Sequence, residues 1–190
     1  MNSNLNLHNF IFKQCFSHIE VARDFLKVHL PATIQQDCDF SKLALEPSSF
    51  IEDDLKQLHS DVLYSLPIKQ QKSYVYCLIE HQSTPNQFMA FRLLRYCFAA
   101  MQQHLNQGNQ TLPIVVPLLF YYGATNPYPF SMNWLDSFEQ SDLAKQIYQQ
   151  PFPLVDITNF SDEAIAQHGQ VSVLEYVQKH IRMRDSLDII

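Results

Sequence analysis

The spacing of apolar and polar positions predicts helices in the first part of the chain. Between Asn9 and Leu30, apolar side chains recur every three or four residues, which is helical spacing. Pro31 ends this stretch, because the residue before a proline is disfavoured in a helix. A short helical turn is expected over residues 32–38. The pattern therefore predicts two helices before the first strand.

Three candidate strands follow, over residues 43–51, 60–67 and 73–83. The third, SYVYCLIEHQS, gives the strongest signal, because tyrosines and β-branched residues dominate its first half. The polar stretch 68–72 separates the second and third strands. Its length predicts a hairpin turn between two neighbouring strands.

Helices and strands alternate through the rest of the chain. The expected elements are a helix over 88–105, a buried strand over 111–122, a loop over 123–129, a helix over 136–148, a short strand over 153–157 and a mostly helical stretch over 162–181. This order predicts an α/β fold in which helices flank a mixed central sheet. No interior linker or repeat interrupts it, so residues 1–190 are expected to form a single domain.

The net charge and the spacing of the cysteines limit the classes of function that the sequence allows. The formal net charge of −6 disfavours a protein that only binds nucleic acid, which usually presents a basic face. It does not exclude a nuclease, because bound divalent cations offset the carboxylates of a nuclease site. The four cysteines are widely spaced and include no CxxC pair, so neither a zinc site nor a disulfide scaffold is predicted.

The chain shows no targeting or membrane signal. Its first residues, MNSNLNLHNFIF, lack a basic start and a small-residue cleavage site. No stretch approaches the roughly 20 apolar residues that span a bilayer. We therefore expect a cytoplasmic protein without a membrane segment.

Three polar residues near strand ends form the candidate chemical site. Asp61 opens one predicted strand and Glu80 ends its neighbour, whereas Gln82 shares the face of Glu80 because side chains alternate along a strand. Asp61, Glu80 and the backbone carbonyl of His81 are suited to hold one cation, and such oxygen ligands favour Mg²⁺ or Mn²⁺. Spacing alone leaves the alternative open that these carboxylates are solvated or hydrogen-bonded surface groups.

Several segments of the chain, in their order along the sequence, resemble one protein family. They include IEVARDFLKVHLP, LEPSSFI, SDVLYSL, YCLIEHQST, VVPLLFYYG and QPFPLVDIT. From about His8 to Asp185 the sequence is similar to the Rpn family, the YhgA-like recombination-promoting nucleases and transposases. The resemblance implies a restriction-endonuclease-like core of the PD-(D/E)XK superfamily and metal-dependent cleavage of DNA. By motif, Asp61 matches the lone Asp, and Glu80-His81-Gln82 matches the family's ExQ form of (D/E)xK.

The sequence departs from similar sequences in three ways. Gln82 stands where the wider superfamily has Lys, so the attacking water would be activated mainly by the metal. Asn9 follows His8 where similar sequences have His-Asp. Full-length relatives also continue with a helical C-terminal region that is expected to be absent here. Because of these departures, the alternative that the chain is a catalytically weakened DNA-binding or assembly module of the same fold stays open.

Other residues have both a functional and a structural interpretation. Arg92 and Arg95 lie on one stripe of the predicted helix 88–105 and are the candidate DNA-phosphate contacts; the alternative is a solvated face. His59 is a candidate hydrogen-bond partner of a metal ligand or a candidate base, although a surface histidine is the simpler interpretation. His81 is expected to be structural. Aromatic residues are candidates for stacking on bases or, more simply, for packing: Phe120, Tyr121, Tyr122, Tyr128, Phe130 and Trp134.

The leading hypothesis is a Mg²⁺- or Mn²⁺-dependent DNA endonuclease of low sequence specificity, linked to recombination or mobile elements. A weakened binding module and an unrelated phosphodiesterase acting on small nucleotides are the alternatives. The partner expected in the first two cases is DNA, and a homo-oligomer is compatible with the sequence.

Overall fold

The computed structural model describes residues 2–46, 62–69 and 74–185. It contains two compact units, residues 1–141 and 142–190, which are described separately. Within the described ranges, no helix combines the length and the apolar content that a membrane span requires.

A four-stranded mixed sheet forms the centre of the first unit. Its strands are β1 (Ala44–Glu46), β2 (Val62–Pro67), β3 (Tyr74–Gln82) and β4 (Ile114–Tyr121), in the spatial order β1-β2-β3-β4. The pairs β1–β2 and β2–β3 are antiparallel, whereas β4 runs parallel to β3. The sequence prediction of a hairpin between the second and third strands is confirmed by this antiparallel pairing.

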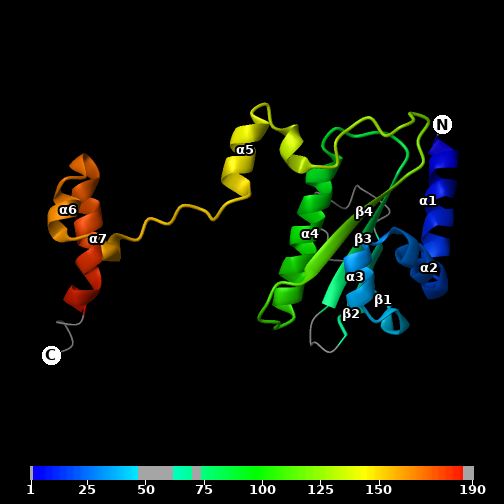
Figure 1. Cartoon of the computed structure of the whole chain (residues 1–190), viewed down its shortest axis with the longest axis horizontal. Helices are drawn as coiled ribbons and strands as arrows, with labels where there is room; N and C mark the ends of the chain where they lie inside the picture. The colour runs from blue at the N-terminus through cyan, green and yellow to red at the C-terminus, as the bar shows by residue number, and fades with distance from the viewer. Residues whose placement is uncertain (1, 47–61, 70–73, 186–190) are drawn as a thin grey trace. The chain divides into compact units, whose positions relative to one another are not determined.

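Helices cover both faces of the sheet (Figure 1). The helices α1 (Asn2–Phe16) and α2 (Ile19–His29) lie on one side, and α4 (Met89–Asn106) lies on the other. The helix α4 also makes the crossover from β3 to the parallel strand β4, which a hairpin cannot do. The short helices α3 (Ala32–Asp37) and η1 (Phe40–Lys42) connect α2 to β1.

Each face of the sheet has its own apolar core. Odd-numbered residues of β3 pack with the N-terminal helices, in a cluster that includes Ala22, Leu26, Tyr64, Cys77 and Ile79. Even-numbered residues of β3 face α4, where the cluster comprises Leu63, Leu78, Met89, Leu93, Tyr96, Cys97, Ala100 and Val115. This division follows from the alternation of side chains along a strand. The α/β fold class with helices flanking a mixed sheet is therefore confirmed.

The structure corrects the predicted N-terminal helices. The stretch 9–30, predicted as one helix, consists of α1 and α2, so three α-helices and the 3₁₀ helix η1 precede β1. The break falls at Ser17, whose hydroxyl donates to the Gln14 carbonyl at 2.7 Å, and at His18, whose backbone is extended. Apolar spacing continues across the break because α1 and α2 both bury residues against the same face of the sheet.

The predicted strand over 153–157 is wrong. These residues have no regular structure before η3 (Ile157–Asn159), and the side chains of Leu154 and Val155 are 84% and 73% exposed. A strand needs a partner for its backbone hydrogen bonds. This segment lies in the second unit, whereas the four described strands belong to the first. The helix predicted over 136–148 is divided between η2 (Trp134–Ser137) and α5 (Ser141–Tyr148).

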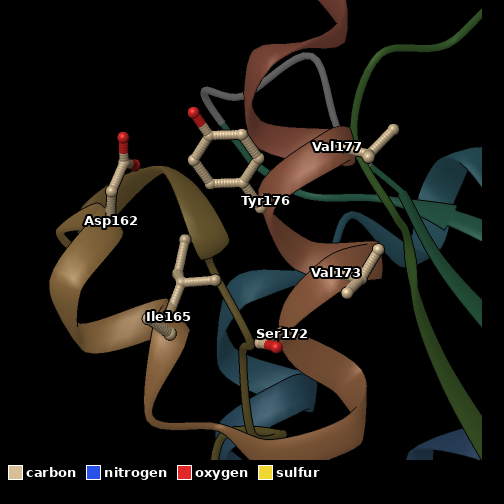
Figure 2. Close-up of a pocket in the computed structure, with 7 residues that line it drawn as sticks. Asp162, Ile165, Ser172, Val173, Tyr176 and Val177 are labelled. Carbon is tan, nitrogen blue, oxygen red and sulfur yellow. The ribbon is translucent and has the colours of Figure 1, made fainter.

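The second unit contains a pair of packed helices, α6 (Asp162–Ala166) and α7 (Ser172–Asp185), linked by η4 (Gly169–Val171). The hydroxyl of Ser161 caps α6, and Asp162 binds Lys179 at 2.7 Å and His180 at 3.0 Å. An apolar groove of about 310 Å³ lies between the helices (Figure 2). The mostly helical character predicted for 162–181 is confirmed.

Candidate active site

Glu80 and Gln82 lie at the C-terminal end of β3 and face α4. Their positions on one face follow from the alternation of side chains, as the sequence predicted. Glu80 is only 2% exposed, and Gln82 is half-buried. The strand places a carboxylate inside the layer between the sheet and α4, where a charged group is costly unless it is paired.

Arg92, in the first turn of α4, supplies the pairing charge. Its Nη2 atom donates a short hydrogen bond to Oε1 of Glu80 and lies 3.3 Å from Oε1 of Gln82. The Arg92 side chain is 11% exposed and that of Glu80 is 3% exposed, so water screens this ion pair little. Gln82 is held at its other end as well, because its Nε2 donates to the Thr84 carbonyl at 2.8 Å.

Several buried polar atoms around this ion pair have no hydrogen-bond partner among the described residues. No described residue bonds Oε2 of Glu80, Nε of Arg92 or the hydroxyl of Tyr96, which lies one turn after Arg92 on α4. Each such buried group costs about 1–3 kcal/mol. A cluster of them around one carboxylate is typical of a place that binds water, an ion or a ligand.

Burial also changes the protonation of this cluster. It raises the pKa of Glu80 to about 7, and the nearby Arg92 guanidinium offsets part of that effect. Burial, with a smaller contribution from the Glu80 carboxylate, raises the pKa of Tyr96 to about 12. A carboxyl with so high a pKa is a candidate functional group, because it gains from the approach of another cation.

His81 lies on the opposite face and is structural, as the sequence predicted. Its ring stacks on Phe12 of α1 at a centroid distance of 4.3 Å and on Tyr122 at 4.3 Å. Burial is the main reason that the pKa of His81 falls to about 4, with a smaller effect of His8. The ring of His8 lies 5.4 Å from that of Tyr122, so α1 passes this end of the sheet. The side chain of Asn9 lies outside the described part.

The turn after β4 packs tightly against the end of β3. The backbone N–H of Tyr122 donates to the Gln82 carbonyl at 3.1 Å, extending the parallel pairing. Gly123 follows, and a Cβ atom there would collide with the Ser83 carbonyl oxygen and the Tyr121 hydroxyl. Only glycine fits this close approach, so the turn fixes the strand end that carries Glu80 and Gln82.

Two predicted residues, Asp61 and His59, lie outside the described residues. In the ranges 2–46, 62–69 and 74–185, no three His, Cys, Asp or Glu side chains come together to hold a metal. Arg92 and Arg95 were predicted to lie on one basic stripe, but their side chains have different surroundings. Arg92 turns toward the sheet, whereas Arg95 is exposed. A role of Arg92 and Arg95 in binding DNA stays a prediction.

The aromatic residues of β4 and the following loop mainly pack within the protein. Phe120 joins the core cluster against the N-terminal helices. Tyr121 and Tyr128 meet edge to face at 4.9 Å, and the Tyr128 hydroxyl donates to the Asn86 carbonyl at 2.9 Å. Tyr122 stacks on His81. These contacts favour packing over the stacking of bases.

Tyr96 is a residue of the site that the sequence did not predict. Its position four residues after Arg92 places both on the same face of α4, and this spacing was the available signal. From the sequence alone, Tyr96 would be interpreted as a core aromatic residue, because its neighbours Leu93, Cys97 and Ala100 are apolar and buried. Only the position of the Glu80 carboxylate beneath α4 distinguishes Tyr96 from an ordinary core residue.

The sequence of the chain matches one family of proteins. Residues 6–190 match the profile of a family described as "Putative transposase, YhgA-like". The recombination-promoting nucleases RpnA and RpnC of Escherichia coli (strain K12) are similar to the chain, at 52% identity over 183 residues and 50% over 178 residues. These alignments cover 96% and 94% of the chain, but 63% and 59% of the relatives.

A further similar protein bears on activity. The inactive recombination-promoting nuclease-like protein RpnE of Escherichia coli (strain K12) is 49% identical over 183 residues, which are 96% of the chain and 61% of that relative. The chain thus spans about three fifths of the length of these three relatives. No solved structure matches the chain.

Proposed function

The chain belongs to the YhgA-like transposase family, and from this premise we propose that it carries a divalent-metal-dependent DNA endonuclease site. The site is formed by Asp61, Glu80 and Gln82 in a PD-(D/E)XK-type arrangement, and it cleaves phosphodiester bonds with low sequence specificity. The observation that carries the proposal is the buried Glu80 carboxylate, which lies at a strand end beside Gln82 with one oxygen unsatisfied by any described residue. Recombination is the proposed setting, since relatives are named for it.

The residues present fit Mg²⁺ or Mn²⁺. Oε2 of Glu80 is a buried, hard oxygen ligand without a described partner, and the amide oxygen of Gln82 lies on the same face. Asp61 precedes Val62, which pairs with Ile79 next to Glu80 in the antiparallel register. We therefore propose Glu80, Asp61 and the His81 carbonyl as ligands. When bound, the metal supplies charge stabilisation at the scissile phosphate and a more acidic water.

The chain's own residues have distinct proposed roles. Glu80 provides the negative charge that holds the cation, and the surrounding apolar core keeps that charge from bulk water. The amide oxygen of Gln82 accepts a hydrogen bond from the attacking water and orients it, because an amide is no base near neutral pH. Arg95, exposed on α4, contacts a DNA phosphate. Because the formal net charge is −6, few such contacts set the affinity for DNA.

A second candidate function has one specific observation behind it. RpnE, named as inactive, is almost as similar to the chain as RpnA and RpnC are. In that case the same site would bind DNA or assemble with other chains without cutting. Location in the cytoplasm and a homo-oligomeric state belong to the proposal in either case.

A plasmid-nicking assay separates these functions. The purified chain is incubated with supercoiled plasmid in Mg²⁺, Mn²⁺, Ca²⁺ or EDTA, together with the variants Glu80→Gln and Glu20→Gln. Glu20 lies exposed on α2 and serves as a matched control for the loss of one carboxylate. Nicking in Mg²⁺ or Mn²⁺ that Glu80→Gln abolishes and Glu20→Gln retains supports the endonuclease.

The other outcomes identify the alternatives. Binding of a short duplex in Ca²⁺ without cleavage in any metal indicates the non-cutting module. Hydrolysis of a small phosphodiester such as bis-p-nitrophenyl phosphate, with no cleavage of DNA, indicates a small-molecule phosphodiesterase. Nicking that persists unchanged in Glu80→Gln contradicts the proposed site.

A further inference from the structure

Arg92 occupies the atoms that the proposed nuclease site needs. Its guanidinium contacts Oε1 of Glu80, the proposed metal ligand, and Oε1 of Gln82, the proposed acceptor for the attacking water. Both oxygens therefore already have a partner in the structure. Arg92 therefore competes with a cation that binds Glu80 through both carboxylate oxygens. It also competes with a water that donates to Gln82.

The described arrangement also leaves Arg92 only partly satisfied. Its Nε has no described partner, nor do Oε2 of Glu80 and the hydroxyl of Tyr96. A buried polar network with several unsatisfied members is less stable than one that is fully bonded. Arg92 thus places a positive charge against Glu80 but leaves hydrogen-bonding capacity that a bound cation and its water ligands would satisfy.

The position of Arg92 allows it to leave without unfolding the helix. It lies in the first turn of α4, after a polar loop and not in the middle of the helix. A long side chain at such a place can rotate outward while the apolar residues of α4, such as Leu93 and Tyr96, stay in the core. The exposed Arg95, one turn further, shows that the outer face of α4 is in contact with solvent.

From these contacts we infer that Arg92 is the resident counter-ion of Glu80, and that divalent metal binds by displacing it. The guanidinium keeps the buried carboxylate neutralised before metal arrives, and its departure frees Oε1 of both Glu80 and Gln82. Arg92 is thus a positioning residue that sets the metal affinity of the site. The inference rests on the proposed function, since it concerns the same metal ligand.

Isothermal titration calorimetry with Ca²⁺ tests this directly, without DNA or cleavage. The full chain, freed of metal, is titrated at pH 8.5 to limit competition by protons at Glu80. Removal of the competing charge in Arg92→Met should tighten Ca²⁺ binding about tenfold or more, because the guanidinium is in contact with the ligand. Arg95→Met removes the same charge from an exposed position and should change the affinity less than about twofold.

The outcomes separate the two proposals. If Glu80→Gln abolishes Ca²⁺ binding but Arg92→Met binds as the parent does, the displacement is wrong and the metal site stands. If Glu80→Gln binds Ca²⁺ with the parent affinity, the metal site itself is wrong, and the displacement fails with it.

A second measurement uses the unmodified sequence, in case Arg92→Met does not fold. In protein labelled with ¹⁵N-arginine, a guanidinium held by a buried carboxylate gives resolved Nη signals, which Arg92→Lys assigns by their loss. Saturating Mg²⁺ should collapse these signals into the averaged signals of a freely rotating guanidinium. Resolved Arg92 signals that persist at saturating Mg²⁺ would overturn the inference.

Discussion

Glu80 and His81 are neighbours with opposite electrostatic effects on stability, and Glu80→Gln should reveal this. Burial raises the pKa of Glu80 from 4.5 to about 7. The folded protein therefore binds this proton more tightly than the unfolded chain does. The resulting stability is fully present below pH 4.5 and is lost as the pH rises to about 7. A shift of this size corresponds to roughly 3 kcal/mol.

His81 has the reverse effect. Its pKa falls from 6.5 to about 4 in the folded state, so the unfolded chain binds the proton more tightly. Stability is present above pH 6.5 and is lost as the pH falls to about 4, again by roughly 3 kcal/mol. Between pH 4.5 and 6.5 the two slopes oppose each other. The parent protein should show little net pH dependence from this pair of residues.

Urea denaturation in EDTA, at intervals of half a pH unit from 4 to 8, measures both effects. Relative to the parent, the free energy of unfolding of Glu80→Gln should rise with pH by roughly 3 kcal/mol between pH 4.5 and 7. His81→Phe retains a ring between Phe12 and Tyr122, and relative to the parent it should gain stability as the pH falls below 6.5. A constant difference between Glu80→Gln and the parent at all these pH values would refute the burial of an unfavourable charge at Glu80.

Further variants test the site and its support. Asp61→Ala and Glu80→Ala should each abolish metal-dependent nicking while the circular dichroism spectrum is retained, and full activity of either would contradict the ligand set. Gln82→Lys should retain or raise nicking, because an ammonium also orients water and stabilises charge; a loss as large as that of Glu80→Ala would show a stricter role. Arg95→Ala should flatten the already shallow salt dependence of duplex binding in Ca²⁺ by about one phosphate contact, and an unchanged slope would place the contact elsewhere. Gly123→Ala should destabilise the protein by about 1–3 kcal/mol in urea denaturation, since its Cβ meets a backbone carbonyl; an unchanged midpoint would contradict that close approach.

Local patterns predicted much of the fold because they reflect burial directly. The tyrosines and β-branched residues of 73–83 identified β3, and the alternation of side chains along a strand placed Glu80 and Gln82 on one face. Helical spacing identified α4 within one residue at each end. The apolar run of 111–122 likewise marked β4. Each of these elements is packed against both a neighbour and a core, so its apolar residues follow the burial of the element.

Other features depend on partners that the sequence does not specify. Residues 153–157 have the composition of a strand but pair with no strand in the described part of the chain. The division between α1 and α2 leaves the apolar spacing unbroken. Arg92 and Arg95 share a stripe in sequence, yet only Arg92 lies over the buried carboxylate. That difference comes from the packing of α4 on β3, which helical spacing alone does not determine.

The most direct test of the metal site is a crystal structure of the chain grown with Mn²⁺, measured at a wavelength that gives an anomalous signal from manganese. We expect one anomalous peak within about 2.0–2.3 Å of a Glu80 carboxylate oxygen, with Asp61 among its ligands and the Arg92 guanidinium moved away from Oε1. A fully occupied Mn²⁺ bound elsewhere, with Glu80 still paired only to Arg92, would contradict it.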